Sequence, residues 1–198
     1  MLRGVYAKRM VLVLVRIALV NSSPTLAVNS DNWIIVDTVR IPDAMDVLRE
    51  KASIKRSLRL FAGSDLEHLI EQSPLLINLG QTPDIRQYLS LPGFSSSSVV
   101  FELSQECDEK KSLTHWQTLL LANIESHPCL LRFYTPAFWQ PIKNELNDAD
   151  LKTLLGPSTS VIWINENGQL EQVIQREKQE ALPKTPYILT SEIFKSWV

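Results

Sequence analysis

Residues 129–139 read CLLRFYTPAFW and predict a buried β-strand that leads directly into a helix. Apart from Arg132, residues Cys129 to Phe133 are of the types that suit a pleated, buried surface. Thr135 suits the N-cap position, where its hydroxyl can accept a hydrogen bond from a free backbone N–H, and Pro136 suits the first helical position. We therefore expect a strand–helix junction here.

From residue 32 onward the chain alternates between segments typical of strands and segments typical of helices. We expect strands at residues 33–39, 58–61, 75–79 and 99–103, and helices at residues 42–54, 64–70, 112–126 and 148–155. The alternation predicts an α/β fold, with a single domain in which a mixed β-sheet is flanked by helices.

Two further helix starts carry local signals. Ser64 and Glu67 have the spacing of a capping box, in which each side chain satisfies a free backbone N–H of the first turn. Thr82-Pro83 repeats the combination of a capping residue and proline seen at residues 135–136.

Two turns or loops also stand out. Residues 161–174 predict a late β-hairpin, because Asn167-Gly168 supplies two residues suited to the positive φ angles of a type I′ turn. Residues 90–98 contain proline, glycine and four consecutive serines, which predicts a loop.

The composition is that of a globular protein. The 198 residues are 44% hydrophobic and 21% charged, and the formal net charge of −2 gives no indication of nucleic-acid binding. The sequence has no Gly-x-Ser-x-Gly turn, no phosphate-binding Gly-Lys-Ser/Thr loop and no Gly-x-Gly-x-x-Gly turn. We therefore expect no cofactor.

Cysteine and histidine residues allow one enzymatic interpretation, a small enzyme of unrecognised type that uses Cys129, His115 or His127. Cys129 lies among apolar residues, which favours a buried core position over a reactive thiolate. His127 and Cys129 would share a strand face, but closed zinc sites need four ligands, so we expect no metal. Cys107 lies in a charged, exposed stretch, and two cysteines favour a reducing compartment, although a pair between them stays open.

The first 27 residues allow several interpretations. Basic residues precede an apolar stretch at residues 10–20, and Thr25 to Ala27 is similar to a cleavage site, as in a secretory signal. Arg16 interrupts the apolar stretch, which is also too short to span a membrane. A misassigned start codon or an additional strand are the alternatives. We expect a cytoplasmic protein that binds no membrane, or an exported one if residues 1–27 act as a signal peptide.

Four residues are candidates for partner binding: Arg132, Tyr134, Phe138 and Trp139. Tyrosine, tryptophan and arginine dominate binding hot spots, although such a cluster is more often part of a core. Arg132 lies between two apolar residues and needs a carboxylate or carbonyl partner, for which a structural ion pair is the expectation. Trp197 is a similar candidate for a docking surface.

Several segments together resemble the effector adaptor-chaperone family of bacterial type VI secretion. The matching segments are Trp33 to Asp37, Leu60 to Ser64, Ser73 to Leu76, Leu130 to Pro136 and Ile162-Trp163. The resemblance implies a non-enzymatic protein that binds a toxic effector and helps to load it onto the VgrG spike, so the implied partners are an effector and VgrG.

The resemblance also implies a domain organisation. Residues 1–30 would be an extension outside the family match, residues 31–191 the adaptor domain, and residues 192–198 the start of a truncated C-terminal helix, since many relatives continue into a helical lobe. The chain departs from the family at Thr135, where an aspartate is usual, and at Ala137, where an arginine is common. Threonine can still cap a helix but carries no charge.

Overall fold

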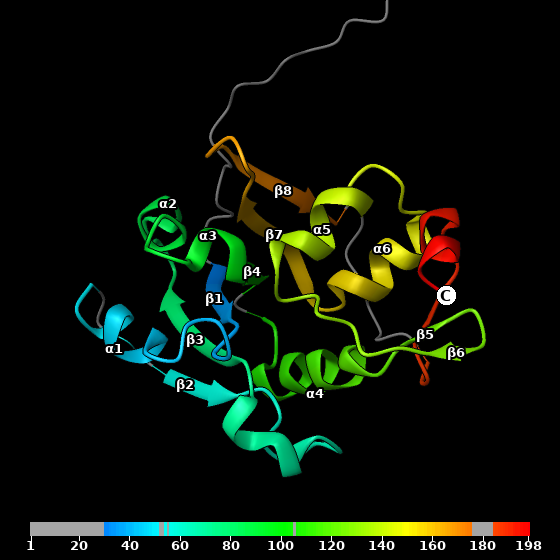
Figure 1. Cartoon of the computed structure of the whole chain (residues 1–198), viewed down its shortest axis with the longest axis horizontal. Helices are drawn as coiled ribbons and strands as arrows, with labels where there is room; N and C mark the ends of the chain where they lie inside the picture. The colour runs from blue at the N-terminus through cyan, green and yellow to red at the C-terminus, as the bar shows by residue number, and fades with distance from the viewer. Residues whose placement is uncertain (1–29, 52–53, 55, 105, 176–183) are drawn as a thin grey trace, which may run out of the picture.

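The computed structural model describes residues 30–51, 54, 56–104, 106–175 and 184–198. Its centre is a six-stranded sheet in the order β2-β3-β1-β4-β7-β8 (Figure 1). The strands are β1 (Ser30–Val36), β2 (Arg56–Arg59), β3 (Leu75–Gly80), β4 (Ser98–Ser104), β7 (Ser158–Ile164) and β8 (Leu170–Ile174). Every neighbouring pair in this sheet is antiparallel.

Both faces of the sheet are buried. Consecutive side chains of a strand point to opposite faces, so β1, β3, β4 and β7 each contribute to both hydrophobic clusters. In β1, Trp33 and Ile35 enter one hydrophobic cluster, whereas Ile34 and Val36 enter the other. The same alternation separates Phe101 from Val100 in β4. A strand with two buried faces must be apolar at nearly every position, which explains the unbroken hydrophobic runs in the sequence.

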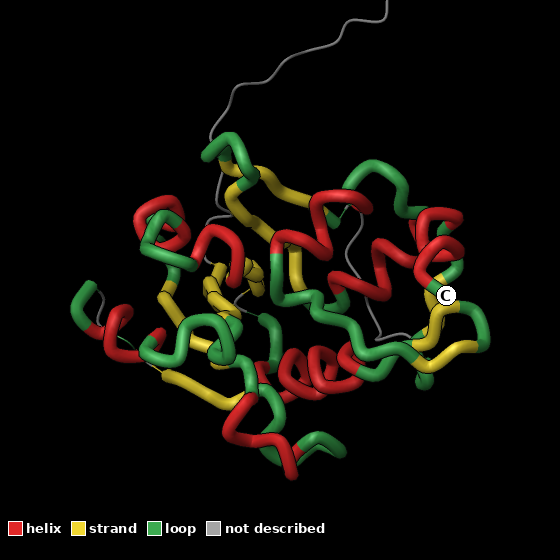
Figure 2. The backbone as a smooth tube through the Cα atoms, in the orientation of Figure 1, coloured by secondary structure: helices red, strands yellow, loops and turns green. Residues whose placement is uncertain are grey.

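Helices form a layer on each side of the sheet, as Figure 2 shows. One face packs against α1 (Ala44–Arg49), α2 (Ile85–Leu89) and α3 (Phe94–Ser97). The other packs against α4 (Glu109–Leu120), α5 (Pro136–Ile142) and α6 (Asp148–Leu155). The predicted α/β fold, with helices flanking a sheet in a single body, is confirmed, but the large sheet is antiparallel throughout and not mixed.

A second, small sheet lies beside this second layer of helices. It consists of β5 (Asn123–Ile124), β6 (His127–Pro128) and β9 (Ile188–Leu189), in the order β6-β5-β9. The β5-β9 pair is parallel, and it ties the C-terminal segment to a segment more than sixty residues earlier. Two 3₁₀ helices, η1 (Glu67–Gln72) and η2 (Glu192–Trp197), complete the described elements.

The predicted strand at residues 129–133 is wrong. Residues 129–132 form no strand of the large sheet, and residues 133 and 134 are in a turn. The segment instead runs extended beside residues 120–122, where the N–H groups of Cys129 and Leu131 donate to the carbonyls of Ala122 and Leu120, each at 2.9 Å. Cys129 is only half-buried, against the expectation of a core position.

The start of α5 agrees with the sequence in place but not in the capping group. Pro136 does occupy the first turn of α5, but the Thr135 hydroxyl donates to the Arg132 carbonyl at 3.1 Å and caps nothing. The helix after Thr82-Pro83 begins at Ile85 and is capped by Asp84. Asp and Asn side chains cap α4 and α6 in the same way.

Other local predictions need correction. The segment with the predicted capping box is the 3₁₀ helix η1, where Ser64 Oγ accepts from Leu66 N and no cap comes from the residue at its N-cap. The predicted loop at residues 90–98 contains α3, which Gly93 precedes with a φ of 81°. The predicted helix at residues 42–54 is shorter, and the one at residues 112–126 begins at Glu109 and ends at Leu120.

The late hairpin is confirmed, as β7 and β8, but its turn is not type I′. Of the two central residues only Gly168 has a positive φ, of 73°. Asn165 shapes the turn instead, since its Oδ1 accepts from the N–H groups of Asn167 and Gln169, both at 2.9 Å. The interpretations of residues 1–27 lie outside the described residues.

Candidate functional site

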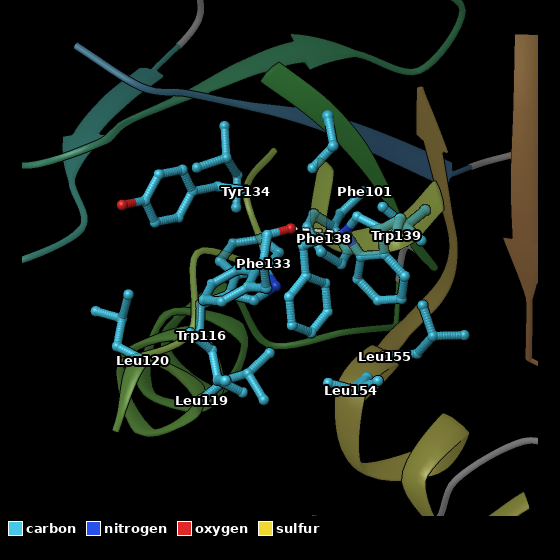
Figure 3. Packing of buried hydrophobic residues seen from close by; sticks show 14 of the residues in the cluster. Phe101, Trp116, Leu119, Leu120, Phe133, Tyr134, Phe138, Trp139, Leu154 and Leu155 are labelled. Carbon is cyan, nitrogen blue, oxygen red and sulfur yellow. Dashed lines mark hydrogen bonds between the residues drawn. The ribbon is translucent and has the colours of Figure 1, made fainter. Parts of the chain in front are cut away.

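The four candidate residues for partner binding divide into one exposed and three buried side chains. Tyr134, Phe138 and Trp139 are buried in the cluster that covers one face of the sheet. Figure 3 shows Phe133, Phe138 and Trp139 close together, with the indole N–H of Trp139 donating to the Phe133 carbonyl at 2.6 Å. Arg132 is the candidate that reaches solvent, with 48% of its side chain exposed. Its role in partner binding stays a prediction.

Arg132 forms an ion pair with Asp37 at the end of β1, as expected of a charged residue in an apolar segment. The Asp37 side chain is only 4% exposed, and it also lies 3.8 Å from the guanidinium of Arg40. The Tyr134 ring centroid lies 6.0 Å from the Arg132 guanidinium carbon. Burial raises the pKa of Tyr134, so its hydroxyl stays protonated at neutral pH.

Next to this cluster lies an open pocket of about 480 Å³, which we call the Leu130 groove. Its lining includes Arg40, Cys129, Leu130, Arg132, Phe138 and Trp197. They come from the loop after β1, from the extended segment 129–132, from α5 and from the C-terminal η2. The groove therefore exists only where three distant parts of the chain meet.

Large apolar side chains are exposed at this groove. Leu130 is 57% exposed and Trp197 is 40% exposed. Two other exposed apolar residues lie close by: Leu121, at the end of α4 beside the extended segment, and Val198, which follows Trp197. Exposed apolar residues that gather in one region are typical of interaction sites, whereas scattered ones need no explanation.

The extended segment holds Leu130 outward because of its backbone pairing. The N–H groups on either side of it, at Cys129 and Leu131, both donate toward residues 120–122. Side chains alternate along an extended segment, so Leu131 is buried while Leu130 and Arg132 are exposed.

The wall formed by Trp197 is held by contacts far from it in sequence. The Trp197 ring packs edge-on against Phe138, with centroids 5.6 Å apart, and against Phe194, at 5.1 Å. The helix η2 that carries it follows Ser191, whose N–H and hydroxyl both donate to the buried carboxylate of Asp150 at 2.6 Å. Asp150 thus anchors one wall of the groove.

The candidate catalytic residues lie in different environments. His115 is buried and its Nδ1 lies 3.0 Å from the Tyr187 hydroxyl, whereas His127 is exposed on β6. Burial lowers the pKa of His115 to about 4, so the ring is neutral at pH 7. Cys129 and Cys107 are both free thiols. Among the described residues, no group of three or more His, Cys, Asp or Glu side chains could hold a metal ion.

Sequence reasoning found part of the groove. It singled out Cys129, Arg132, Phe138 and Trp197, but not Arg40 or Leu130, and it did not identify Asp37 as the partner of Arg132. The one available signal was the charge of Arg132 within an apolar run, which required a carboxylate somewhere in the fold. Nothing local in the sequence says which carboxylate.

Comparison with known proteins gives one match. The family model described as "Domain of unknown function (DUF4123)" matches residues 32–153, which is more than half of the chain and runs from β1 into α6. No curated protein and no solved structure shows a significant match. Within the part of the chain that the structure describes, no helix is long and apolar enough to cross a membrane.

Proposed function

The chain belongs to the DUF4123 family, and from this membership we propose that it is an adaptor-chaperone of bacterial type VI secretion. In this role it binds a toxic effector and helps to load it onto the VgrG spike, without catalysing a reaction. It works in the cytoplasm, where effector and spike are assembled before export. The family supports this role through the resemblance of the segments from Trp33 to Trp163 to these adaptors.

The observation that carries the proposal is the Leu130 groove. A binding protein needs an accessible surface on which apolar side chains can be covered, and Leu130 and Trp197 provide one beside two arginines. Stable protein–protein interfaces bury about 1,200–2,000 Å² in total, so the groove would be the centre of a larger contact. The exposed Leu121, at the end of α4 beside residues 129–131, extends the same region.

Co-expression with the products of the neighbouring genes tests this function. We expect the chain to co-purify with an effector encoded next to it, with a VgrG protein, or with both, and to elute with that partner in size-exclusion chromatography. An effector from an unrelated gene cluster serves as the control, since an adaptor is specific to its cargo. Absence of a complex with every neighbouring effector and spike protein would overturn the proposal.

A further inference from the structure

We propose that the Leu130 groove binds a short segment of the effector in which a carboxylate lies next to a large apolar side chain. The proposal rests on the proposed function for the identity of the partner, but its chemistry comes from the groove alone. The groove has an apolar part and a cationic part, and each part selects one feature of the segment.

The apolar part consists of Leu130, Trp197 and the neighbouring Phe138 and Cys129. Leu130 and Trp197 are the exposed members, so a side chain that covers them removes apolar surface from water on both molecules. A volume of about 480 Å³ accommodates one or two large side chains, not a whole folded element. We assign the occupant to the effector because a chaperone covers apolar segments of its cargo before that cargo is delivered.

The cationic part consists of Arg40 and Arg132. Both guanidinium groups pair with one carboxylate, that of Asp37, so two positive charges face a single negative one. Among the described residues, Asp37 is the one carboxylate that forms a salt bridge with either of them. About half of each arginine side chain is exposed, 51% for Arg40 and 48% for Arg132. A carboxylate from a partner would therefore complete the charge balance.

The arginines are also held in place before a partner arrives. Arg132 is fixed by Asp37, and Asp37 is itself fixed because its Oδ1 accepts from the Val39 N–H at 3.1 Å. A guanidinium has five N–H donors in a rigid fork, so one that already pairs with Asp37 retains donors for a second carboxylate. Preorganised groups lose less conformational entropy on binding, which favours recognition of a carboxylate here.

The backbone of the extended segment gives the partner a third point of contact. The N–H groups of Cys129 and Leu131 donate toward residues 120–122, so the peptide groups of Leu130 between them point the opposite way. Within the described chain, no hydrogen bond engages those groups. An effector segment that runs alongside residues 129–132 can pair with them as an added strand.

Peptide binding to the full chain tests the proposal. Overlapping short peptides that tile the neighbouring effector and the VgrG protein are measured by fluorescence anisotropy. We expect the tightest binders to come from the effector and to combine Asp or Glu with Leu, Phe or Trp. Leu130→Asp and Arg40→Glu should each weaken them at least about tenfold, as loss of a central contact does. Changing the carboxylate of the peptide to Lys should restore binding to Arg40→Glu.

Matched variants and a chemical readout control for folding. Ile174→Asp and Arg49→Glu make the same changes at exposed side chains outside the groove, and they should bind as the unmodified chain does. A bound peptide should also protect Cys129, which lines the groove, from alkylation while leaving Cys107 reactive. This second measurement needs no variant.

The outcomes separate this proposal from the proposed function. If the intact effector binds equally to the unmodified chain, Leu130→Asp and Arg40→Glu, the groove is not the docking site, but the adaptor function stands. If the bound peptides come from VgrG, or lack a carboxylate, the stated occupant is wrong. If neither the effector nor VgrG binds the unmodified chain, the adaptor function itself fails, and this proposal fails with it.

Discussion

The guanidinium of Arg132 pairs with the carboxylate of Asp37, a residue 95 positions earlier in the chain. This contact joins the end of the central strand β1 to the segment that leads into α5, and Arg40 approaches the same carboxylate from the loop after β1. One buried acid thus organises both positive charges of the Leu130 groove.

Replacing Arg132 with Ala should lower the free energy of unfolding, because the Asp37 carboxylate stays buried with only Arg40 near it. A fully buried pair would cost about 3–5 kcal/mol, but half of Arg132 is exposed, so we expect about 1–2 kcal/mol. Urea denaturation measures it. Arg49→Ala, which removes an exposed pair with Asp46, should change stability by less than about 0.5 kcal/mol. Equal losses of stability in the two variants would contradict a stabilising role for the Arg132–Asp37 ion pair.

Replacing Asp150 with Ala should loosen the C-terminal segment. The variant leaves the N–H groups of Thr190 and Ser191 and the Ser191 hydroxyl without their acceptor, at 2.8, 2.6 and 2.6 Å respectively. Several unsatisfied buried groups together should cost about 3–5 kcal/mol. Hydrogen exchange should rise first in residues 187–197. Glu145→Ala, at an exposed residue, is the control. An unchanged exchange rate in residues 187–197 of the Asp150→Ala variant would show that Asp150 does not anchor this segment.

Replacing Gly156 with Ala should destabilise the chain for two reasons. Gly156 has a φ of 54°, and a Cβ there would lie 2.3 Å from the His115 ring. Strain and overpacking together should cost about 3 kcal/mol. Part of that cost should disappear in a His115→Ala background, giving a coupling of about 1–2 kcal/mol in a double-mutant cycle. Strictly additive effects would show that the ring is not the obstacle.

Acidification should destabilise the protein through His115. Burial lowers its folded-state pKa to about 4, below its ordinary value of 6.5, so the unfolded chain binds the proton more readily between these pH values. Stability from this residue is present above pH 6.5 and is lost as the pH falls toward 4, by about 3 kcal/mol in total.

Comparison of variants isolates this contribution from that of the carboxylates. The free energy of unfolding, measured in urea from pH 7.5 to 4, should fall less steeply for His115→Gln than for the unmodified chain. His127→Gln changes an exposed histidine and should follow the unmodified chain. Parallel curves for all three proteins would mean that His115 is not buried in its neutral form.

The strands of the large sheet could be predicted from the sequence because burial on both faces leaves an unbroken apolar run. Trp33 to Val36 and Val161 to Ile164 carry that pattern, and the structure places both in central strands. Residues 129–133 carry a similar pattern for another reason. They pack extended against the end of α4 and the small sheet, so their apolar side chains are explained by a neighbour that the local sequence does not reveal.

The groove was less predictable than the fold because its geometry depends on long-range contacts. Arg132 signalled a need for a carboxylate, but Asp37 directly follows a strand whose sequence reads as purely structural. The exposure of Leu130 follows from the N–H groups beside it, not from its own chemistry, and an apolar residue in an apolar run gives no warning of it. The Thr135 hydroxyl donates to the Arg132 carbonyl, and no N–H group of the first turn of α5 donates to it.

The assembly of the Leu130 groove from residues 40, 130 and 197 has a thermodynamic consequence. An unfolded chain does not possess the groove, so a ligand held there binds the native state alone and shifts the folding equilibrium toward it, by about 2.7 kcal/mol at a concentration one hundred times its dissociation constant. Stabilisation would then be mutual: the bound effector segment protects the adaptor from unfolding and proteolysis for as long as the complex persists.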